Sequence, residues 1–138
     1  MNSYRFADID LGLGQSFQVT VTPAMVDMFS DLSGDCSPLH IDPNFAADYG
    51  FSDRVVHGML TASFYSTLVG IYLPGKFALF QGADISFTAP VFPGDTLTVT
   101  GEVVSIHEAY RQIELKAYIT NQHGQKVSRA KIRTGIHE

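Results

Sequence analysis

The sequence predicts an α+β domain in which an antiparallel sheet packs around one buried helix. Helix signals occur in the first half of the chain, whereas the alternating pattern of strands dominates from Phe77 onward. Between them, the stretch Met59–Leu73 is apolar on nearly every side, and no other element is apolar enough to fill the concave face of such a sheet. With 138 residues and neither repeats nor linkers, we expect one domain over residues 1–138.

The first half opens with a strand and a capped helix. In residues 15–22, QSFQVTVT, apolar and polar side chains alternate, which is typical of a half-buried strand. Thr22-Pro23 then supplies a helix N-cap followed by proline at the first helical position. Gly34 can adopt the left-handed conformation that ends helices, so we expect a helix between these points.

Two further helices are predicted before the sheet. Asp42-Pro43 repeats the helix-start signal, and the short helix that follows should end at Gly50. The third helix begins after His57-Gly58 with the sequence MLTASFYSTLVG. Because it is apolar almost all round and rich in small residues, we expect it to be enclosed on most sides. Its apolar stretch is shorter than the roughly 20 residues that a bilayer span requires.

The second half reads as a series of strands separated by turns. Alternating apolar positions predict four strands, marked by the following residues: Ile85 and Phe87; Leu97 and Val99; Ile113, Leu115, Ala117 and Ile119; Ala130, Ile132, Thr134 and Ile136. Turn signals are Pro74-Gly75, Pro93-Gly94 and His123-Gly124. The apolar register shifts after Gly101, which predicts a bulge there.

Composition limits the kinds of partner. Only 17% of residues are charged and the formal net charge is -5, so a clustered basic surface for nucleic acid or an anionic membrane is not expected. Cys36 is the only cysteine, which excludes an internal disulfide and favours reducing cytosol. The beginning, MNSYRFADID, is polar and acidic and does not resemble a signal peptide. We therefore expect a cytoplasmic protein that binds neither nucleic acid nor membrane.

Ionisable groups are concentrated in the stretch SGDCSPLHIDP, residues 33–43, which we expect to be a loop between two helices. Asp35 and His40 lie five residues apart, and Pro38 restricts the backbone between them so that the two side chains could converge. A carboxylate and an imidazole around one water suit acid–base chemistry near neutral pH. The alternative is that the aspartate caps a turn and the histidine is satisfied by backbone.

Other groups of the loop have simpler explanations. Asp42 precedes Pro43 and is explained as an N-cap. Cys36 could be a nucleophile, but nothing beside it would lower the pKa of its thiol, and small buried cysteines are common. His40, Asp42 and His57 match no zinc-binding spacing, so no metal is predicted.

A second candidate is Gly58 in the stretch RVVHGML. It should stand at the N-terminus of the third helix, where backbone N–H groups are unpaired and the helix dipole is positive. Lacking a Cβ, its amide could approach a ligand carbonyl and stabilise an enolate oxygen. The alternative is a glycine needed only for close packing. Ser66, two turns into the same helix, could face the loop or merely keep that face small.

These two stretches together resemble a known family. SGDCSPLHIDP followed by FSDRVVHGMLTAS is similar to the MaoC-like (R)-specific enoyl-CoA hydratases and dehydratases of the hot-dog fold, whose motif has the form D-x-N-P-[LIV]-H-x-[DE]-P. The later stretch LPGKFALFQGADISFTAPVFPGDTL also looks like the family's turn and following strand. The resemblance extends over most of the chain.

The resemblance implies both a fold and a set of roles. It implies an antiparallel sheet wrapped around a long central helix, with protomers paired edge to edge into a homodimer or a higher homo-oligomer. It implies that Asp35 and His40 hold the reacting water, that the Gly58 amide is the oxyanion donor, and that Ser66 supports the catalytic hydrogen bonds. Ser37 stands where the family motif usually has Asn, and its hydroxyl offers fewer donors than an amide.

The activity that follows is reversible hydration of a trans-2-enoyl-CoA to the (R)-3-hydroxyacyl-CoA, with the thioester as substrate and no cofactor. Three alternatives remain open: a hot-dog acyl-CoA thioesterase, a non-catalytic acyl-thioester binding subunit, and a dehydratase acting on an acyl-carrier thioester. The sequence does not decide the acyl chain length, the choice between CoA and acyl carrier protein, or the pathway. It also leaves open whether Asp35 or His40 takes the proton from water.

Overall fold

A five-stranded antiparallel sheet forms the body of the protein in this computed structural model, which describes all of residues 1–138. The strand order is β1-β3-β4-β5-β2. The strands are β1 (Gly14–Thr20), β2 (Ala78–Phe87), β3 (Thr96–His107), β4 (Gln112–Thr120) and β5 (Lys126–Ile136). The expected α+β class and the alternation of buried and exposed residues along β3, β4 and β5 are confirmed.

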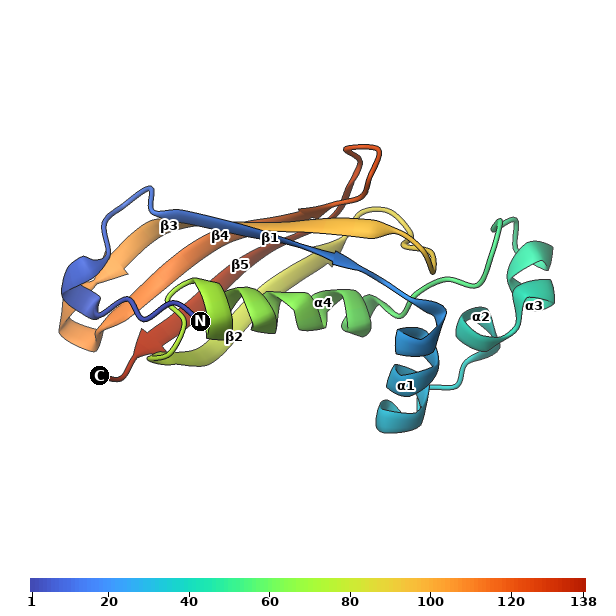
Figure 1. Cartoon of the computed structure of the whole chain (residues 1–138), viewed down its shortest axis with the longest axis horizontal. Coiled ribbons are helices and arrows are strands. Elements are labelled where there is room, and N and C mark those ends of the chain that lie inside the picture. Colours follow the sequence, from blue (N-terminus) through green and yellow to red (C-terminus); the bar gives the residue numbers. More distant parts are fainter.

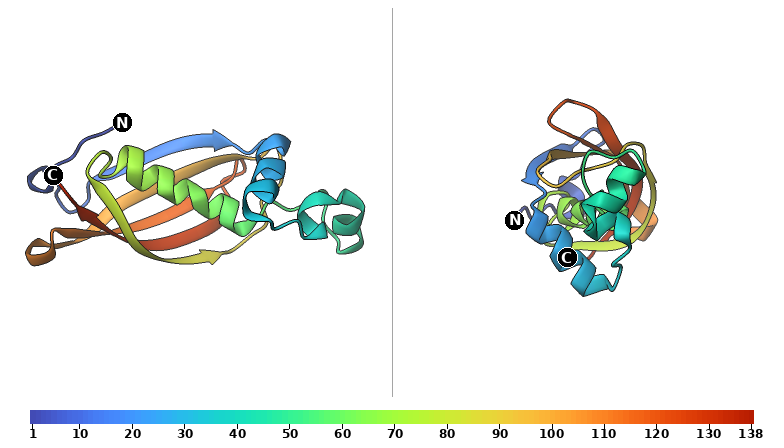
Figure 2. Two further views of the ribbon diagram at one scale, coloured as in Figure 1. Left: turned by 90° about the horizontal axis from the view of Figure 1, so that it is seen from below. Right: turned by 90° about the vertical axis from the view of Figure 1, so that its right-hand side faces the viewer.

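The sheet curves around one central helix, α4 (Gly58–Thr67), which continues as a π-helical turn over Leu68–Tyr72 (Figures 1 and 2). The concave face of the sheet supplies alternate apolar side chains to the space around this helix, and the helix supplies Tyr65, Leu68 and Val69, all buried. Burial of this apolar surface is the main driving force for the fold. No helix of the chain is both long and apolar enough to cross a bilayer.

The central helix is enclosed on most sides, as expected, but one face of it is open. The side chain of Met59 is 63% exposed, and Ser63 and Ser66 are exposed as well. These three residues recur at intervals of three and four, so they share one stripe of the helix. The helix is buried only where the curved sheet and the N-terminal segments cover it.

Three short helices gather at the N-terminal end of α4 (Figure 1): α1 (Pro23–Ser33), α2 (Pro38–Ile41) and α3 (Pro43–Asp48). The predicted caps are present, because Thr22 accepts a hydrogen bond from the Met25 amide and Asp42 accepts from the Asn44 amide. Gly34 ends α1 with φ of 78°. The segment expected to be a non-helical loop contains one helical turn, α2, which Pro38 begins.

Two details of the sheet differ from what the sequence predicted. The bulge expected at Gly101 lies between Val103 and Ser105. Gly101 is required for another reason: a Cβ there would lie 2.7 Å from the Leu68 side chain of the central helix. The β3–β4 connection carried no glycine or proline signal, and Arg111 makes the turn in the left-handed conformation with φ of 48°.

Candidate active site

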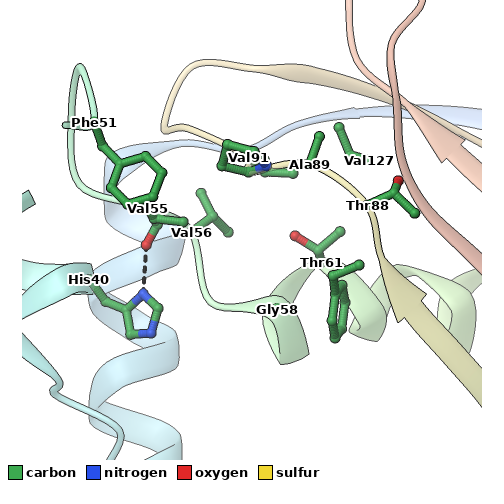
Figure 3. Close-up of a pocket in the computed structure, with 12 residues that line it drawn as sticks. His40, Phe51, Val55, Val56, Gly58, Thr61, Thr88, Ala89, Val91 and Val127 are labelled. Atoms are coloured by element: carbon green, nitrogen blue, oxygen red, sulfur yellow. Dashed lines mark hydrogen bonds between the residues drawn. The ribbon is translucent and has the colours of Figure 1, made fainter. Parts of the chain in front are cut away.

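The three short helices bring the loop of residues 33–43 to the N-terminus of α4. His40, on α2, stacks on His57, the N-cap residue of α4, with ring centroids 3.9 Å apart. The His40 Nδ1 atom lies 2.6 Å from the Val55 carbonyl oxygen (Figure 3). Because a carbonyl can only accept, Nδ1 carries a proton, and in the neutral ring Nε2 is left with its lone pair.

Asp35 faces the free nitrogen of His40. The Asp35 Oδ2 and His40 Nε2 atoms are 3.9 Å apart, which is too far for a direct hydrogen bond. A water about 2.8 Å from both atoms would see them at an angle of about 90°, close to what its two O–H groups can span. The His40 side chain is 15% exposed and lines a cavity, and the Asp35 side chain beside it is 52% exposed, so the gap between them is open to solvent. The predicted convergence of the two side chains is thus present in the structure.

The backbone around Asp35 holds its carboxylate in place. The Asp35 Oδ1 atom accepts a hydrogen bond of 3.3 Å from the Ser37 amide, which leaves Oδ2 for the side facing His40. Ser37 begins α2 as its N-cap residue, but its side chain makes no capping hydrogen bond. Its contribution in this chain therefore comes from the backbone N–H, which any residue except proline could supply.

Gly58 lies at the first position of α4 and lines the same cavity as His40. The first hydrogen bond along the helix runs from the Thr61 amide to the His57 carbonyl at 3.1 Å, so the Gly58 amide has no acceptor within the helix. A Cβ on Gly58 would lie 3.0 Å from the Phe87 ring. Close packing is therefore one reason for glycine at this position, and the positively polarised helix end is compatible with the oxyanion role.

His57 is a residue whose part in the site the sequence did not reveal. Its ring is 2% exposed, and its Nε2 atom lies 2.9 Å from the Asp35 carbonyl oxygen and 3.2 Å from Ser30 Oγ. The carbonyl fixes the proton on Nε2, and Nδ1 is buried without a partner. The side-chain nitrogen and oxygen atoms of Asp35, His40 and His57 lie within 4.8 Å of one another. Asp42 is not part of this cluster, because its carboxylate caps α3.

A cavity of about 480 Å³ opens beside these groups (Figure 3). Its polar side chains are those of His40, Thr61 and Thr88, and the rest of its lining is apolar or glycine. The apolar part comprises Phe51, Val55, Val56, Phe87, Ala89, Pro90, Val91 and Val127. A mostly apolar cavity with a few convergent polar groups is the usual form of a small-molecule site.

The remaining candidates lie away from the cavity. Ser66 is exposed on the open stripe of α4 and is absent from the lining, so its supporting role stays a prediction. Cys36 is exposed rather than buried and also does not line the cavity.

Comparison with known proteins gives a consistent picture. The family described as MaoC like domain matches residues 6–125. An (R)-specific enoyl-CoA hydratase of Aeromonas caviae is 48% identical over 85 residues, which span 62% of this chain and 63% of that enzyme. An (R)-specific enoyl-CoA hydratase of Rhodospirillum rubrum is 37% identical over 101 residues, spanning 73% of this chain and 70% of that enzyme.

Solved structures agree over nearly the whole chain. The (R)-hydratase of A. caviae involved in PHA biosynthesis superposes with a TM-score of 0.89 at 36% identity, covering 93% of this chain and 97% of that one. The R-hydratase PhaJ1 of Pseudomonas aeruginosa has a TM-score of 0.91 at 28% identity, covering 97% and 86%. The hot-dog fold expected from the sequence is confirmed by these matches. The chain belongs to the MaoC-like dehydratase family.

Proposed function

We propose that this protein is a hydro-lyase that adds water reversibly to a trans-2-enoyl-CoA and gives the (R)-3-hydroxyacyl-CoA. The observation that carries the proposal is the gap of 3.9 Å between Asp35 Oδ2 and His40 Nε2, with His40 in the lining of a mostly apolar cavity. The relatives described above, which are named as (R)-specific enoyl-CoA hydratases, support the same activity.

The pair can both hold and activate water. Asp35 Oδ2 and His40 Nε2 are both acceptors, because the His40 proton is engaged by the Val55 carbonyl. One water can donate a hydrogen bond to each of them, which turns its oxygen lone pairs toward the substrate. As that oxygen bonds to C3 of the enoyl group, one of the two acceptors takes a proton, and a proton is then delivered to C2.

The thioester carbonyl is the natural partner of the helix end. Attack at C3 shifts electrons through C2 onto the carbonyl oxygen, which becomes enolate-like. The Gly58 amide and the positive end of α4 would stabilise that oxygen, an effect that is worth about 100- to 1,000-fold for a single good donor. The substrate supplies its own electrophile, so the proposed reaction needs neither metal nor redox chemistry.

Three related functions would use the same pocket, and product or binding assays distinguish them from hydration. A thioesterase would release free CoA from the substrate, and a binding subunit would bind acyl-CoA without turnover. A dehydratase for carrier-protein substrates would act on the acyl-carrier thioester much faster than on the CoA ester. Both hydration and thioester hydrolysis need an activated water, and the relatives named as (R)-specific enoyl-CoA hydratases favour hydration.

The proposed assembly is a homodimer. Strand β2 lies at the edge of the sheet, and its side chains Leu79, Phe80 and Phe87 are 49%, 40% and 48% exposed. An unprotected apolar edge strand beside the open stripe of α4 suits pairing with a second copy. Ser66 lies on that stripe and would then face the partner. Light scattering should give twice the mass of one chain; a monomer at micromolar concentration would contradict this part of the proposal.

The experiment is to hydrate trans-2-enoyl-CoA substrates of four to twelve carbons and to analyse the configuration of the product. We expect the (R)-3-hydroxyacyl-CoA and no free CoA. An (S) product, release of CoA, or binding without turnover across the series would each overturn the proposal and point to a different one of the alternatives.

A further inference from the structure

The hydroxyl of Thr61 is buried and has no hydrogen-bond partner within the chain. The residue is 2% exposed. A threonine inside a helix usually donates its hydroxyl proton to the carbonyl three or four residues earlier, but Thr61 makes no such bond. An unpaired buried hydroxyl is destabilising. Its hydrogen-bonding capacity is therefore unused by the fold itself.

Thr61 lies on the wall of the cavity that holds His40 and Gly58 (Figure 3). The other lining hydroxyl, that of Thr88, donates to the Lys126 carbonyl at 2.8 Å and is thereby satisfied. The Thr61 hydroxyl is directed toward the side of the cavity bounded by Val56 and Val91. It is thus an available hydroxyl in an otherwise apolar part of the site.

The position of Thr61 along α4 indicates which part of a substrate it meets. Thr61 follows Gly58 by three residues, so its Cα lies about 4.5 Å further along the helix axis. The thioester carbonyl, held by the Gly58 amide, and C3, facing the Asp35–His40 water, belong beyond the end of the helix. The Thr61 side chain projects from the side of the helix, one turn further on, and shares the cavity lining with Phe87 and Val127; we place the chain beyond the double bond along this wall.

We propose that the Thr61 hydroxyl is a specificity-determining group that favours acyl chains carrying a hydrogen-bonding oxygen beyond the reacting double bond over plain alkyl chains. The inference rests on the proposed hydratase function and names the class of acyl group for the same site. An alkyl chain in the cavity leaves the hydroxyl without a partner, whereas a chain hydroxyl or keto oxygen pairs with it. Leaving one such buried group unpaired lowers kcat/KM about 10- to 100-fold.

The test compares the trans-2-hexenoyl thioester of CoA with its 5-hydroxy, 6-hydroxy and 5-oxo derivatives. The wild-type protein is expected to prefer at least one oxygenated substrate by about tenfold or more in kcat/KM. Thr61→Val keeps the shape and removes the hydroxyl, so it should turn over the alkyl substrate faster and lose the preference. Thr61→Ser keeps the hydroxyl and is the matched control, which should retain the preference. Equal preference ratios in the wild type and Thr61→Val would overturn the inference.

A binding measurement separates this inference from the hydratase proposal. Saturated hexanoyl-CoA and its 5-hydroxy, 6-hydroxy and 5-oxo derivatives cannot be hydrated, so their dissociation constants report the cavity alone. If no enoyl-CoA is turned over, the hydratase proposal fails, yet tighter binding of an oxygenated ligand to wild type than to Thr61→Val still supports the Thr61 role. Equal binding of hexanoyl-CoA and all three oxygenated ligands to the wild type overturns the Thr61 role even if hydration is normal.

Folding of the variant gives an independent readout. Replacing an unpaired buried hydroxyl by a methyl group removes a desolvated polar atom, so Thr61→Val should unfold at the same or a higher temperature than wild type. A clearly lower unfolding temperature would mean that the hydroxyl already has a partner in the folded chain, and that result would contradict the proposal.

Discussion

Replacing His57 tests whether the site is positioned by its buried imidazole. In wild type the Nε2–H group donates to the Asp35 carbonyl at 2.9 Å, and the ring stacks on His40 at 3.9 Å between centroids. His57→Phe keeps an aromatic ring and removes the donor. His57→Gln retains a side-chain N–H donor and removes the ring. The two variants therefore separate the hydrogen bond from the stacking contact.

The size of the effect follows from these contacts. Without the Nε2 donor the Asp35 carbonyl and the buried Ser30 hydroxyl both lose this partner, which costs about 1–3 kcal/mol of folding free energy. The carboxylate of the same residue would also move relative to His40, and a displacement of about 1 Å in a reacting group can cost about 100-fold in rate. For His57→Phe we expect a loss of about 1–3 kcal/mol in stability and of about 10- to 100-fold in kcat. For His57→Gln we expect a smaller loss of kcat, because the donor is retained.

The assays are urea denaturation and the pH dependence of hydration of trans-2-butenoyl-CoA. A residue that only positions the catalytic groups should lower kcat at every pH and leave unchanged the two pKa values that bound the pH–rate curve. If the rate of His57→Phe no longer fell on one side of the pH optimum, His57 itself would be the group that transfers protons. A wild-type kcat in the folded His57→Phe variant would refute the positioning role altogether.

Three further outcomes follow from single contacts. Ser37→Asn should leave kcat within about threefold or raise it, since Ser37 acts through its backbone N–H; a large loss in the same hydration assay would show that the serine side chain is specialised. Gly58→Ala should lower kcat/KM about 10- to 100-fold, because a Cβ there would hinder the close approach of the thioester carbonyl to the amide and press on the Phe87 ring; unchanged kinetics would contradict the oxyanion role. Burial raises the pKa of Tyr65 to about 12, although the hydrogen bond to Ser128 acts in the opposite direction. The folded protein therefore keeps a proton on Tyr65 that the unfolded chain releases near pH 10. This difference contributes about 2–3 kcal/mol to the free energy of unfolding. The contribution is fully present below pH 10 and is lost as the pH rises toward 12. Urea denaturation at pH 9 and 11.5 should show a smaller pH-dependent loss in Tyr65→Phe than in wild type; equal losses would contradict the assignment.

Local signals in the sequence predicted the fold well. Thr22-Pro23, Gly34 and Asp42 act on the backbone next to them, so their caps and stops could be read without tertiary information. The strands from β3 onward were predictable because alternation needs only one buried face. The bulge was misplaced because the need for Gly101 comes from Leu68, a contact between distant parts of the chain.

The site was predictable to the extent that one loop contains it. Pro38 constrains the backbone between Asp35 and His40, and the structure brings these two side chains together. The part played by His57 could not be read from the sequence, because it depends on a stack and a hydrogen bond across 17 and 22 residues of chain. The exposure of Ser66 could not be predicted either, because it depends on which elements pack against α4, and the local sequence pattern does not specify them.

The most direct test of the central claim is the rate of hydration of trans-2-butenoyl-CoA by Asp35→Asn and His40→Ala, measured beside wild type with folding checked by circular dichroism. The claim is that the two side chains share one water across the gap of 3.9 Å. Each variant should remain folded and lose about 2 to 4 orders of magnitude in kcat, and the double variant should lose little more, because the two groups act as one unit. Near-wild-type rates in both folded single variants would contradict the account.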